Sequence, residues 1–296
     1  MPLPLCAPEP EKVAYNILTM RLGLLLLLAA LALPAADMRT SAAKSGQQYP
    51  ANYNIPLWEP GHVPLAKGDG PLDAPFLTVF QPPEGKRNST AVVIAPGGSN
   101  IMLMYGLEGI DIAERFNDWG VTAFVLTYRL SPRYGDDARA LDGNRAMQIV
   151  RSRAKEFGLD PAKIGFAGFS AGGAMARLTV DYAKPGDPTA ADPLDRIASK
   201  PDWLVMVYGP SRPMNNENLK DFPPTFLLSA AFDRGAANGT AQLFLDMNKA
   251  GAVAELHIYQ KGRHGFGAGN GSPEFSLWMD TLHHFLVQGN FLPKAK

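Results

Sequence analysis

The chain has 296 residues, 46% of them hydrophobic and 19% charged, so it is long enough to bury the core of one large domain. Its 28 Lys and Arg residues balance its 28 Asp and Glu residues, and the sequence contains no block of like charges. This balance argues against a nucleic acid or another polyanion as the partner.

The N-terminal segment has the pattern of a secretory signal peptide. Arg21 precedes the apolar residues 22–33, which are followed by the small residues 34–36. A basic residue, a short apolar core and small residues are typical of such a signal, and the apolar core is too short for a comfortable membrane span. We therefore expect a signal peptide at about residues 20–36 and a secreted or periplasmic protein without stable membrane insertion.

Cleavage of this signal is expected after Ala36 or Ala43, and an uncleaved membrane anchor is the alternative. Met20 is the better candidate for the start of translation, so the residues before it are interpreted as an upstream extension. Extension and signal peptide together then occupy residues 1–43. The single cysteine, Cys6, lies in this part. The mature protein is therefore expected to have no disulfide, no thiolate nucleophile and no thiolate metal site.

The next segment, residues 44–75, is rich in Pro, Gly, Asn and Ala and has no periodicity, which predicts an irregular arm. Residues 76–80 read Phe-Leu-Thr-Val-Phe and are followed by Pro82 and Pro83. This pattern predicts an edge strand, and the folded domain is expected to occupy residues 76–296.

From residue 91 onward, apolar strands alternate with helices. The strands are predicted at residues 91–95, 122–126, 163–167, 203–208, 225–228 and 254–259. The helices are predicted at residues 109–119, 137–157, from 174 onward, 239–250 and 273–288. Continuous apolar strands alternating with helices predict an α/β fold in which helices cover both faces of a mostly parallel sheet. The short span between Tyr208 and Pro224 leaves little room for a large cap domain.

The most informative motif is Gly-Phe-Ser-Ala-Gly at residues 168–172. It follows the predicted strand 163–167 and precedes a helix-forming run that begins at Ala174. A Gly-x-Ser-x-Gly motif at a strand-to-helix junction is typical of a nucleophile elbow, in which small neighbours let the serine make a sharp, strained turn. The motif predicts that Ser170 is a nucleophile; a structural glycine turn is the alternative.

A serine hydroxyl needs a general base to become a nucleophile, and the base needs an orienting carboxylate. In a fold of this kind both partners follow the serine, first the acid and then the histidine. His264 lies in a glycine-rich loop directly after the last predicted strand, and we predict that it is the base. The remaining histidines are predicted to be surface or core residues: His62, His257, His283 and His284.

Asp233 is the predicted acid, because it lies where the chain leaves the strand at residues 225–228. Asp221 precedes that strand and Asp246 falls inside the following helix, so both are poorly placed. A turn aspartate without a catalytic role is the alternative for Asp233.

An oxyanion formed by attack on an ester also needs backbone N–H donors. We predict one donor at Ala171, directly after the nucleophile, and two at Gly98 and Ser99, in the glycine loop after strand 91–95. An ordinary glycine turn is the alternative. Met102, Met104 and Tyr105, which follow this loop, are candidates for a substrate pocket or for simple packing.

Other polar residues are interpreted structurally. Asp142 and Arg145 lie three apart in a predicted helix and are expected to form a pair, and Arg129 is expected to anchor a loop through an ion pair. The sequence has no metal-ligand spacing and no phosphate-binding loop, so we predict neither a metal nor a cofactor.

These motifs together resemble the α/β-hydrolase superfamily, specifically its secreted acetyl-esterase and acetyl-xylan-esterase-like branch, from about residue 50 to the C-terminus. The resemblance implies that residues 76–296 are a catalytic domain in which Ser170 is the nucleophile, Asp233 the acid and His264 the base. The stretches that carry it are residues 55–58 (Ile-Pro-Leu-Trp), 95–98 (Ala-Pro-Gly-Gly), 108–109, 122–130, 160–165, 168–173, 223–226 and 264–267.

The chain departs from the pattern of this branch at two places. Ser99 and Asn100 stand where a third glycine and an aromatic residue are usual, and residues 234–237 read Arg-Gly-Ala-Ala where Pro-Val-Val-Pro is typical. The first departure leaves the backbone donors in place but changes the pocket, and the second changes the shape available to a substrate.

The resemblance implies a secreted serine carboxylesterase that removes acetyl groups from sugars or from a polysaccharide such as acetylated xylan. A peptidase related to the oligopeptidase hydrolases is an alternative, although those enzymes usually carry an additional large domain. A catalytically silent binding protein on the same scaffold is the other alternative, because a fold alone does not guarantee activity.

Overall fold

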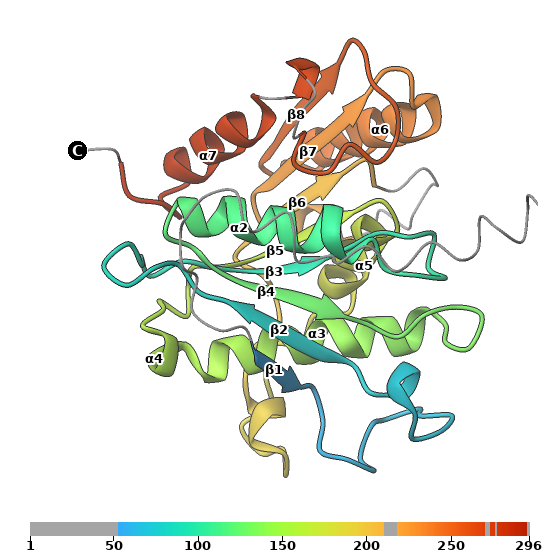
Figure 1. Cartoon of the computed structure of the whole chain (residues 1–296), viewed down its shortest axis with the longest axis vertical. Helices are drawn as coiled ribbons and strands as arrows, with labels where there is room; N and C mark the ends of the chain where they lie inside the picture. Colours follow the sequence, from blue (N-terminus) through green and yellow to red (C-terminus); the bar gives the residue numbers. More distant parts are fainter. Residues whose placement is uncertain (1–52, 210–217, 270–272, 276, 295–296) are drawn as a thin grey trace, which may run out of the picture. The chain divides into compact units, whose positions relative to one another are not determined.

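Among the residues that the structure describes, eight strands form one sheet in the order β1-β2-β4-β3-β5-β6-β7-β8 (Figure 1). Strands β1 and β2 are antiparallel, as are β2 and β4, and the other pairs are parallel. The predicted α/β fold with a mostly parallel sheet is therefore confirmed. The strands are β1 (Tyr53–Pro56), β2 (Phe76–Phe80), β3 (Ala91–Ala95), β4 (Thr122–Thr127), β5 (Ile164–Phe169), β6 (Trp203–Val207), β7 (Thr225–Ala230) and β8 (Ala254–Tyr259).

This computed structural model describes residues 53–209, 218–269, 273–275 and 277–294. The predicted extension and signal peptide at residues 1–43 lie outside the described residues. In the described part of the chain, none of the helices combines the length and the apolar character that a membrane span needs.

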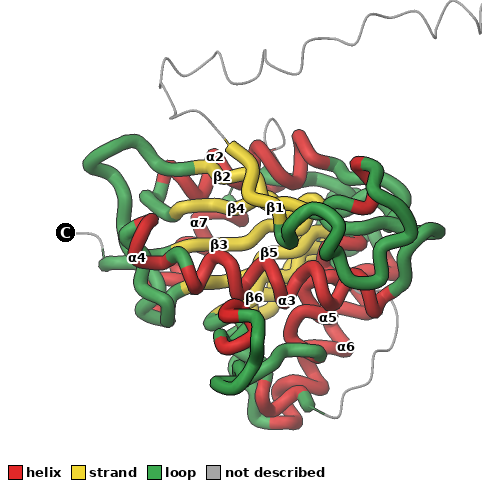
Figure 2. The backbone as a smooth tube through the Cα atoms, turned by 90° about the horizontal axis from the view of Figure 1, so that it is seen from below, coloured by secondary structure: helices red, strands yellow, loops and turns green. Residues whose placement is uncertain are grey.

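Helices cover both faces of the sheet, and Figure 2 shows the strands as the layer between them. Because side chains alternate along a strand, Val93 of β3 packs in one core with α3 and α5, while Val92 packs in the other with α2 and α7. The helices are α2 (Asp111–Asp118), α3 (Asp136–Ser152), α4 (Ala154–Phe157), α5 (Ala171–Asp181), α6 (Arg234–Ala250) and α7 (Trp278–Gln288). Shorter turns are η3 (Pro71–Asp73), η4 (Tyr105–Ile110), η5 (Pro193–Arg196), η6 (Leu219–Asp221) and η7 (Pro273–Phe275).

The arm predicted to be irregular contains a strand, so the sheet begins earlier than residue 76. Strand β1 pairs with β2, with Ile55 opposite Leu77, and β1 rather than β2 forms the edge. Ile55 and Leu57 are buried in the core with Leu77. This burial explains why a short segment that contains Pro56 extends the sheet, since proline is tolerated on an edge strand.

Several helix boundaries also differ from the prediction. The single helix predicted at residues 137–157 is two helices, α3 and α4, separated by Arg153, which has φ −97° and ψ 11°. Helix α6 begins at Arg234, five residues before the predicted start, because Asp233 caps it and its side chain accepts a hydrogen bond from Ala236. At the C-terminus, the predicted helix 273–288 divides into η7 and α7.

A buried ion pair fastens the arm to the domain. Arg129 and Asp142 are 1% and 0% exposed, and their closest atoms, Nη2 and Oδ1, lie 2.7 Å apart. Arg129 also donates to the carbonyl of Pro64 at 2.5 Å, and its guanidinium lies over the rings of Trp58 and Tyr134. Arg129 thus forms the predicted ion pair, whereas the expected pairing of Asp142 with Arg145 is wrong.

Arg145 instead donates to Asp192 at 2.6 Å and to the carbonyl of Leu57 at 3.1 Å. Helix α3 therefore directs Asp142 toward Arg129 and Arg145 toward the segment before η5. The loop around residues 57–64 is held from two positions of the same helix.

A second clamp holds the arm at Asp73. Its carboxylate accepts two hydrogen bonds from Arg133, at 2.7 and 3.0 Å, and another from the hydroxyl of Tyr134. The hydrogen bond from Arg133 is the main cause that lowers the pKa of Asp73 below its usual range. The ionised carboxylate is therefore favoured in the folded protein relative to the unfolded chain.

We predict that Asp142→Asn lowers the free energy of unfolding by about 3–5 kcal/mol, because it leaves the buried guanidinium of Arg129 without a counter-charge. Urea unfolding of the two proteins measures this difference. The matched control is Glu156→Gln, which removes the partner of Arg153 in a pair 52% exposed at the glutamate. The control should change stability by about 1 kcal/mol or less, and equal effects of the two substitutions would contradict the assignment.

We predict that Asp73→Asn destabilises the protein at neutral pH and that this difference shrinks below about pH 4. Because the folded-state pKa of Asp73 is lowered, its contribution to stability is present above the usual aspartate range and disappears as the pH falls through the lowered value. Urea unfolding of wild type and variant at pH 7 and pH 3 tests this, with Asp69→Asn on the same arm as the control. A difference that is the same at both pH values would refute the prediction.

Candidate active site

The predicted elbow lies between β5 and α5. Ser170 follows the last residue of β5 and precedes Ala171, the first residue of α5, and its backbone has φ 52° and ψ −118°. A positive φ is strained for serine. The strain is imposed by close packing, since a Cβ on Gly172 would lie 1.9 Å from the carbonyl oxygen of Ala95, and one on Gly168 would lie 2.0 Å from that of Gly172.

The structure brings the three predicted triad residues into one hydrogen-bonded chain. Ser170 Oγ lies 2.6 Å from Nε2 of His264, whose Nδ1 is hydrogen-bonded to Oδ2 of Asp233. A carboxylate can only accept, so Nδ1 of His264 carries the proton and Nε2 accepts from the hydroxyl of Ser170. This arrangement is the one in which imidazole can remove the proton from Ser170.

Asp233 has a second partner that fixes its side chain. While Oδ2 accepts from His264, Oδ1 accepts from the backbone N–H of Ala236 in the first turn of α6, at 3.4 Å. The helix start thereby orients the carboxylate toward the imidazole. His264 itself remains 47% exposed, so solvent reaches the base.

The loop after β3 approaches Ser170 closely. A Cβ on Gly97 would lie 2.7 Å from Cβ of Ser170, and Gly98, Ser99 and Asn100 all have positive φ, at 129°, 56° and 62°. The carbonyl of Gly98 accepts from the N–H groups at positions 101 and 102 and so closes a tight turn. The predicted donor positions Gly98 and Ser99 therefore lie in a strained turn beside the nucleophile.

Some backbone N–H groups near Ser170 already donate to acceptors within the protein, and others lie at the predicted oxyanion-donor positions. Ser170 N–H donates to the carbonyl of Val207, and Gly97 N–H donates to Glu108. Ala171 is the first residue of α5, where an N–H has no partner within the helix. The oxyanion role of Gly98, Ser99 and Ala171 remains a prediction.

Two buried residues behind the site were missed by sequence reasoning. Glu108 is 2% exposed, and its Oε1 accepts a hydrogen bond from the hydroxyl of Tyr208 at 2.8 Å. The Tyr208 ring packs 4.8 Å from the ring of His264, measured between centroids. Two signals mark Glu108 in the sequence: it lies in the mostly apolar segment 101–112, and residues 108–109 are among the stretches that carry the family resemblance. Neither signal indicates that Tyr208 is its partner.

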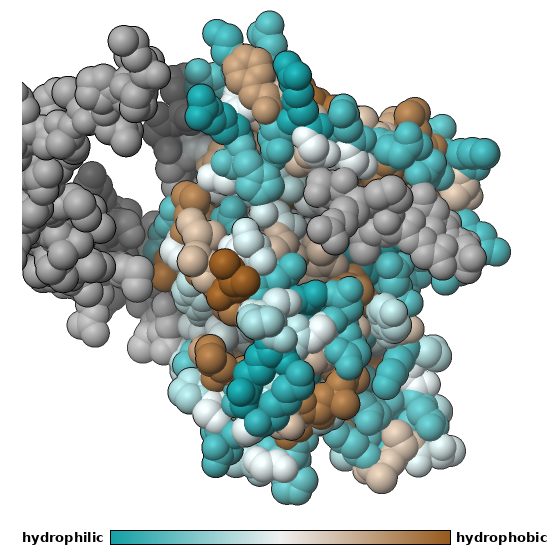
Figure 3. Space-filling view, turned by 90° about the vertical axis from the view of Figure 1, so that its right-hand side faces the viewer, coloured by the Kyte–Doolittle hydropathy of each residue, from teal (hydrophilic) through white to brown (hydrophobic). Residues whose placement is uncertain are grey.

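Exposed apolar side chains lie close in the chain to the predicted oxyanion loop and to Asp233. Met102 and Met104 are exposed, as is Phe232, next to Asp233. Tyr105 instead donates its hydroxyl to Thr78 at 2.5 Å and packs in the fold. Figure 3 shows the face toward which β3 and β4 point in Figure 1, and its hydrophobic residues lie in separate spots among hydrophilic ones.

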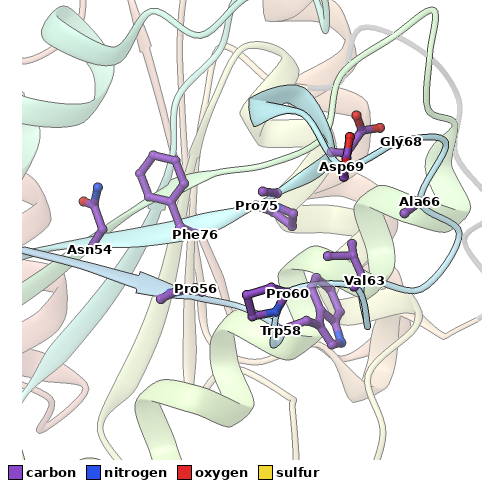
Figure 4. A pocket seen from close by; sticks show the side chains of 13 residues that line it. Asn54, Pro56, Trp58, Pro60, Val63, Ala66, Gly68, Asp69, Pro75 and Phe76 are labelled. Carbon is purple, nitrogen blue, oxygen red and sulfur yellow. The ribbon is translucent and has the colours of Figure 1, made fainter.

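A cavity of about 540 Å³ lies elsewhere, between the arm and strands β1 and β2. Trp58 and Val63 line one part of it, and Asn54 and Phe76 another (Figure 4). None of the triad residues lines this cavity. In the described part of the chain, no group of three His, Cys, Asp or Glu side chains is arranged to hold a metal ion.

We predict that Ser170→Gly is more stable than Ser170→Ala by about 1 kcal/mol. Both variants lose the hydroxyl, but only glycine tolerates φ 52° without strain; relief of roughly 1–3 kcal/mol is partly offset by the larger unfolded-state entropy of glycine, about 0.5–1 kcal/mol. Urea unfolding measures the difference. A less stable glycine variant would show that the elbow stores no strain.

Known protein sequences that are similar to this chain include esterases. The family described as BD-FAE matches residues 77–186. The acetylxylan esterase of Xylanibacter ruminicola is 29% identical over 233 residues, which are 68% of this chain and 45% of that protein. The carboxylesterase NlhH of Mycobacterium tuberculosis is 36% identical over 123 residues, 40% of this chain and 38% of that protein. The chain thus spans less than half the length of both relatives.

Solved structures give the same fold. An acetyl ester-xyloside bifunctional hydrolase from Caldicellulosiruptor lactoaceticus is 29% identical, has a TM-score of 0.71 and covers 81% of this chain and 97% of its own. Esterase 2 of Thermogutta terrifontis, phosphoramylated by tabun, is 23% identical with a TM-score of 0.65 over 85% of this chain and 100% of its own, which supports the fold alone. In the part of the chain that the structure describes, no separate cap domain interrupts the sheet. The strand order and these structural matches show that the chain has an α/β-hydrolase fold.

Proposed function

We propose that the protein is a serine carboxylesterase that hydrolyses short-chain esters, acetyl esters above all. The observation that carries the proposal is the chain of hydrogen bonds that runs from Ser170, at the start of α5, through His264 to Asp233, at the start of α6. The similarity to an acetylxylan esterase and to a carboxylesterase supports it.

The proposed reaction has two steps. Oγ of Ser170 attacks the ester carbonyl carbon while its proton passes to Nε2 of His264, and the backbone N–H groups at Gly98, Ser99 and Ala171 stabilise the oxyanion. The alcohol leaves with the proton from His264, and the acyl group stays on Ser170. Water then attacks the carbonyl carbon of this acyl-enzyme and gives a proton to Nε2 of His264. The bond between the acyl carbon and Oγ breaks, His264 returns the proton to Oγ of Ser170, and the carboxylic acid leaves.

The proposed substrates are acetylated sugars or a polysaccharide such as acetylated xylan. An acetylxylan esterase and an acetyl ester-xyloside hydrolase stand among the similar proteins. The exposed position of His264 fits a site that a bulky polymer can reach. We also propose that the protein acts outside the cytoplasm, on the basis of the signal-like pattern at residues 20–36.

We predict that Ser170→Ala lowers kcat for 4-nitrophenyl acetate by a factor on the order of 10⁴ to 10⁶, because the attacking atom is lost. Asp233→Asn should lower kcat about 10⁴-fold, because His264 loses the acceptor that fixes its tautomer. Initial rates of the purified variants measure both effects. Equal rates for wild type and Ser170→Ala would end the esterase proposal.

The substrate class is tested by comparing 4-nitrophenyl acetate, 4-nitrophenyl octanoate, a dipeptide amide and acetylated xylan. The proposal expects the acetate to exceed the octanoate in kcat/KM and acetate to be released from xylan. Preference for the amide would make the protein a peptidase, and activity on none of the four would favour a silent binding protein.

A further inference from the structure

Glu108 is a buried carboxylate for which the described residues provide no cationic partner. It is 2% exposed, and in the described part of the chain its hydrogen-bond donors are both neutral, the hydroxyl of Tyr208 and the backbone N–H of Gly97. A buried charge held only by neutral donors is expensive for a fold. Its position between two loops of the active site offers a reason for keeping it.

The carboxylate of Glu108 connects the oxyanion loop with the histidine loop. Oε2 accepts from Gly97 N–H at 2.7 Å, directly before the predicted donors. Oε1 accepts from Tyr208, whose hydroxyl oxygen in turn accepts from the N–H of Gly267 at 3.0 Å, three residues after His264. One side chain therefore fixes the backbone on both sides of the nucleophile.

The surrounding packing leaves these loops little freedom. A Cβ on Gly267 would lie 2.7 Å from Cγ of Leu107, so the histidine loop rests directly on the residue before Glu108. A Cβ on Gly97 would lie 2.6 Å from Oε2 of Glu108. Glu108 belongs to η4, a π-helical turn, a geometry often found at functional sites.

The donors around Glu108 match its ionised form. Oε2 must accept from Gly97, and the hydroxyl of Tyr208 already accepts from Gly267 and so offers its own proton to Oε1. A protonated Glu108 would donate to Tyr208 and leave the tyrosine proton without this acceptor. Burial raises the pKa of Glu108, and the hydrogen bonds from Tyr208 and Gly97 and the charge of nearby His264 act against that rise.

We propose that Glu108 is a positioning residue for the esterase reaction, holding the oxyanion loop and the histidine loop in register through Gly97 and Tyr208. The inference rests on the proposed function and deepens it. Glu108 touches neither substrate nor nucleophile in this scheme. It acts by keeping the N–H donors after Gly97 and the imidazole of His264 at a fixed separation around Ser170.

Its charge provides a second, separable effect. Among the described residues, Asp233 and Tyr208 contact His264, Glu108 lies behind Tyr208, and Arg263 precedes His264 in the chain. A carboxylate nearby favours the protonated imidazole. Removing the charge of Glu108 should therefore move the acid limb of the kcat/KM profile to lower pH, an effect that a purely structural role would not produce.

We predict that Glu108→Gln lowers kcat for 4-nitrophenyl acetate by about 10- to 100-fold with KM changed less than about threefold, because both loops lose their register. The amide keeps the shape but cannot accept from Gly97 and Tyr208 at once. Tyr208→Phe, which keeps the charge and the ring against His264, should lower kcat about 10-fold without moving the acid limb to lower pH. The double variant should lose less than the product of the two, because both break one network.

The matched control is Glu114→Gln, a half-buried glutamate of α2 outside both loops, which should keep wild-type kcat and pH profile. All variants are compared by circular dichroism and urea unfolding. If Glu108→Gln does not fold, Tyr208→Phe decides. Wild-type kcat in both folded variants, or a lowered kcat with an unshifted acid limb in Glu108→Gln, would overturn the inference.

A readout without ester turnover separates this inference from the proposed function. Diethyl 4-nitrophenyl phosphate transfers its phosphoryl group to Oγ of Ser170 and releases 4-nitrophenolate, and intact mass reports the rate. A wild type that is phosphorylated in a Glu108-dependent way but hydrolyses no ester would overturn only the proposed function. An active esterase with Glu108-independent phosphorylation would overturn only the inference, and a wild type inert to both reagents would overturn both.

Discussion

The contact of helix α5 with strands β3 and β5 is the constraint on which the site depends. No atom larger than hydrogen fits between Gly172 and the carbonyl of Ala95, or between Gly168 and the carbonyl of Gly172. The chain must therefore turn at Ser170 with a positive φ, which raises the hydroxyl above the sheet edge. Because Gly97 lies only two residues after the end of β3, the same contact brings the loop with the predicted oxyanion donors against the nucleophile.

The triad residues could be predicted because each has a local signal in the sequence and because the parallel sheet brings the three residues to one edge. Ser170 is marked by two flanking glycines, and His264 by a glycine-rich loop after the last strand. Asp233 was chosen by its position after a strand rather than by a motif. Since β5, β7 and β8 are parallel, their carboxyl ends share one edge, so three residues distant in sequence converge there without further information.

The features that were mispredicted or missed depend on pairings between distant segments. Strand β1 forms because Ile55 is buried beside Leu77 of β2, and the composition of the proline-rich arm gives no sign of this pairing. The start of α6 was missed because glycines at positions 235 and 239 lower the helix propensity of its first turns, so the capping role of Asp233 is not evident in the sequence. Glu108 and Tyr208 lie 100 positions apart, and only the tertiary structure shows that their side chains meet.

Asp142 and Glu108, two of the buried carboxylates in the described part of the chain, differ in how far their charge acts. Asp142 is paired with Arg129 at 2.7 Å, so the two charges cancel beyond their immediate surroundings and the pair serves to hold the arm. Glu108 is held by a hydroxyl and an amide, which stabilise a negative charge without neutralising it. The charge of an uncompensated carboxylate in a low-dielectric interior interacts with neighbouring ionisable groups. His264, which packs against the other side of Tyr208, is such a group. Among the described residues no cation lies beside Glu108, which is unfavourable for stability alone but lets the charge of this side chain act on the base while its hydrogen bonds hold the loops.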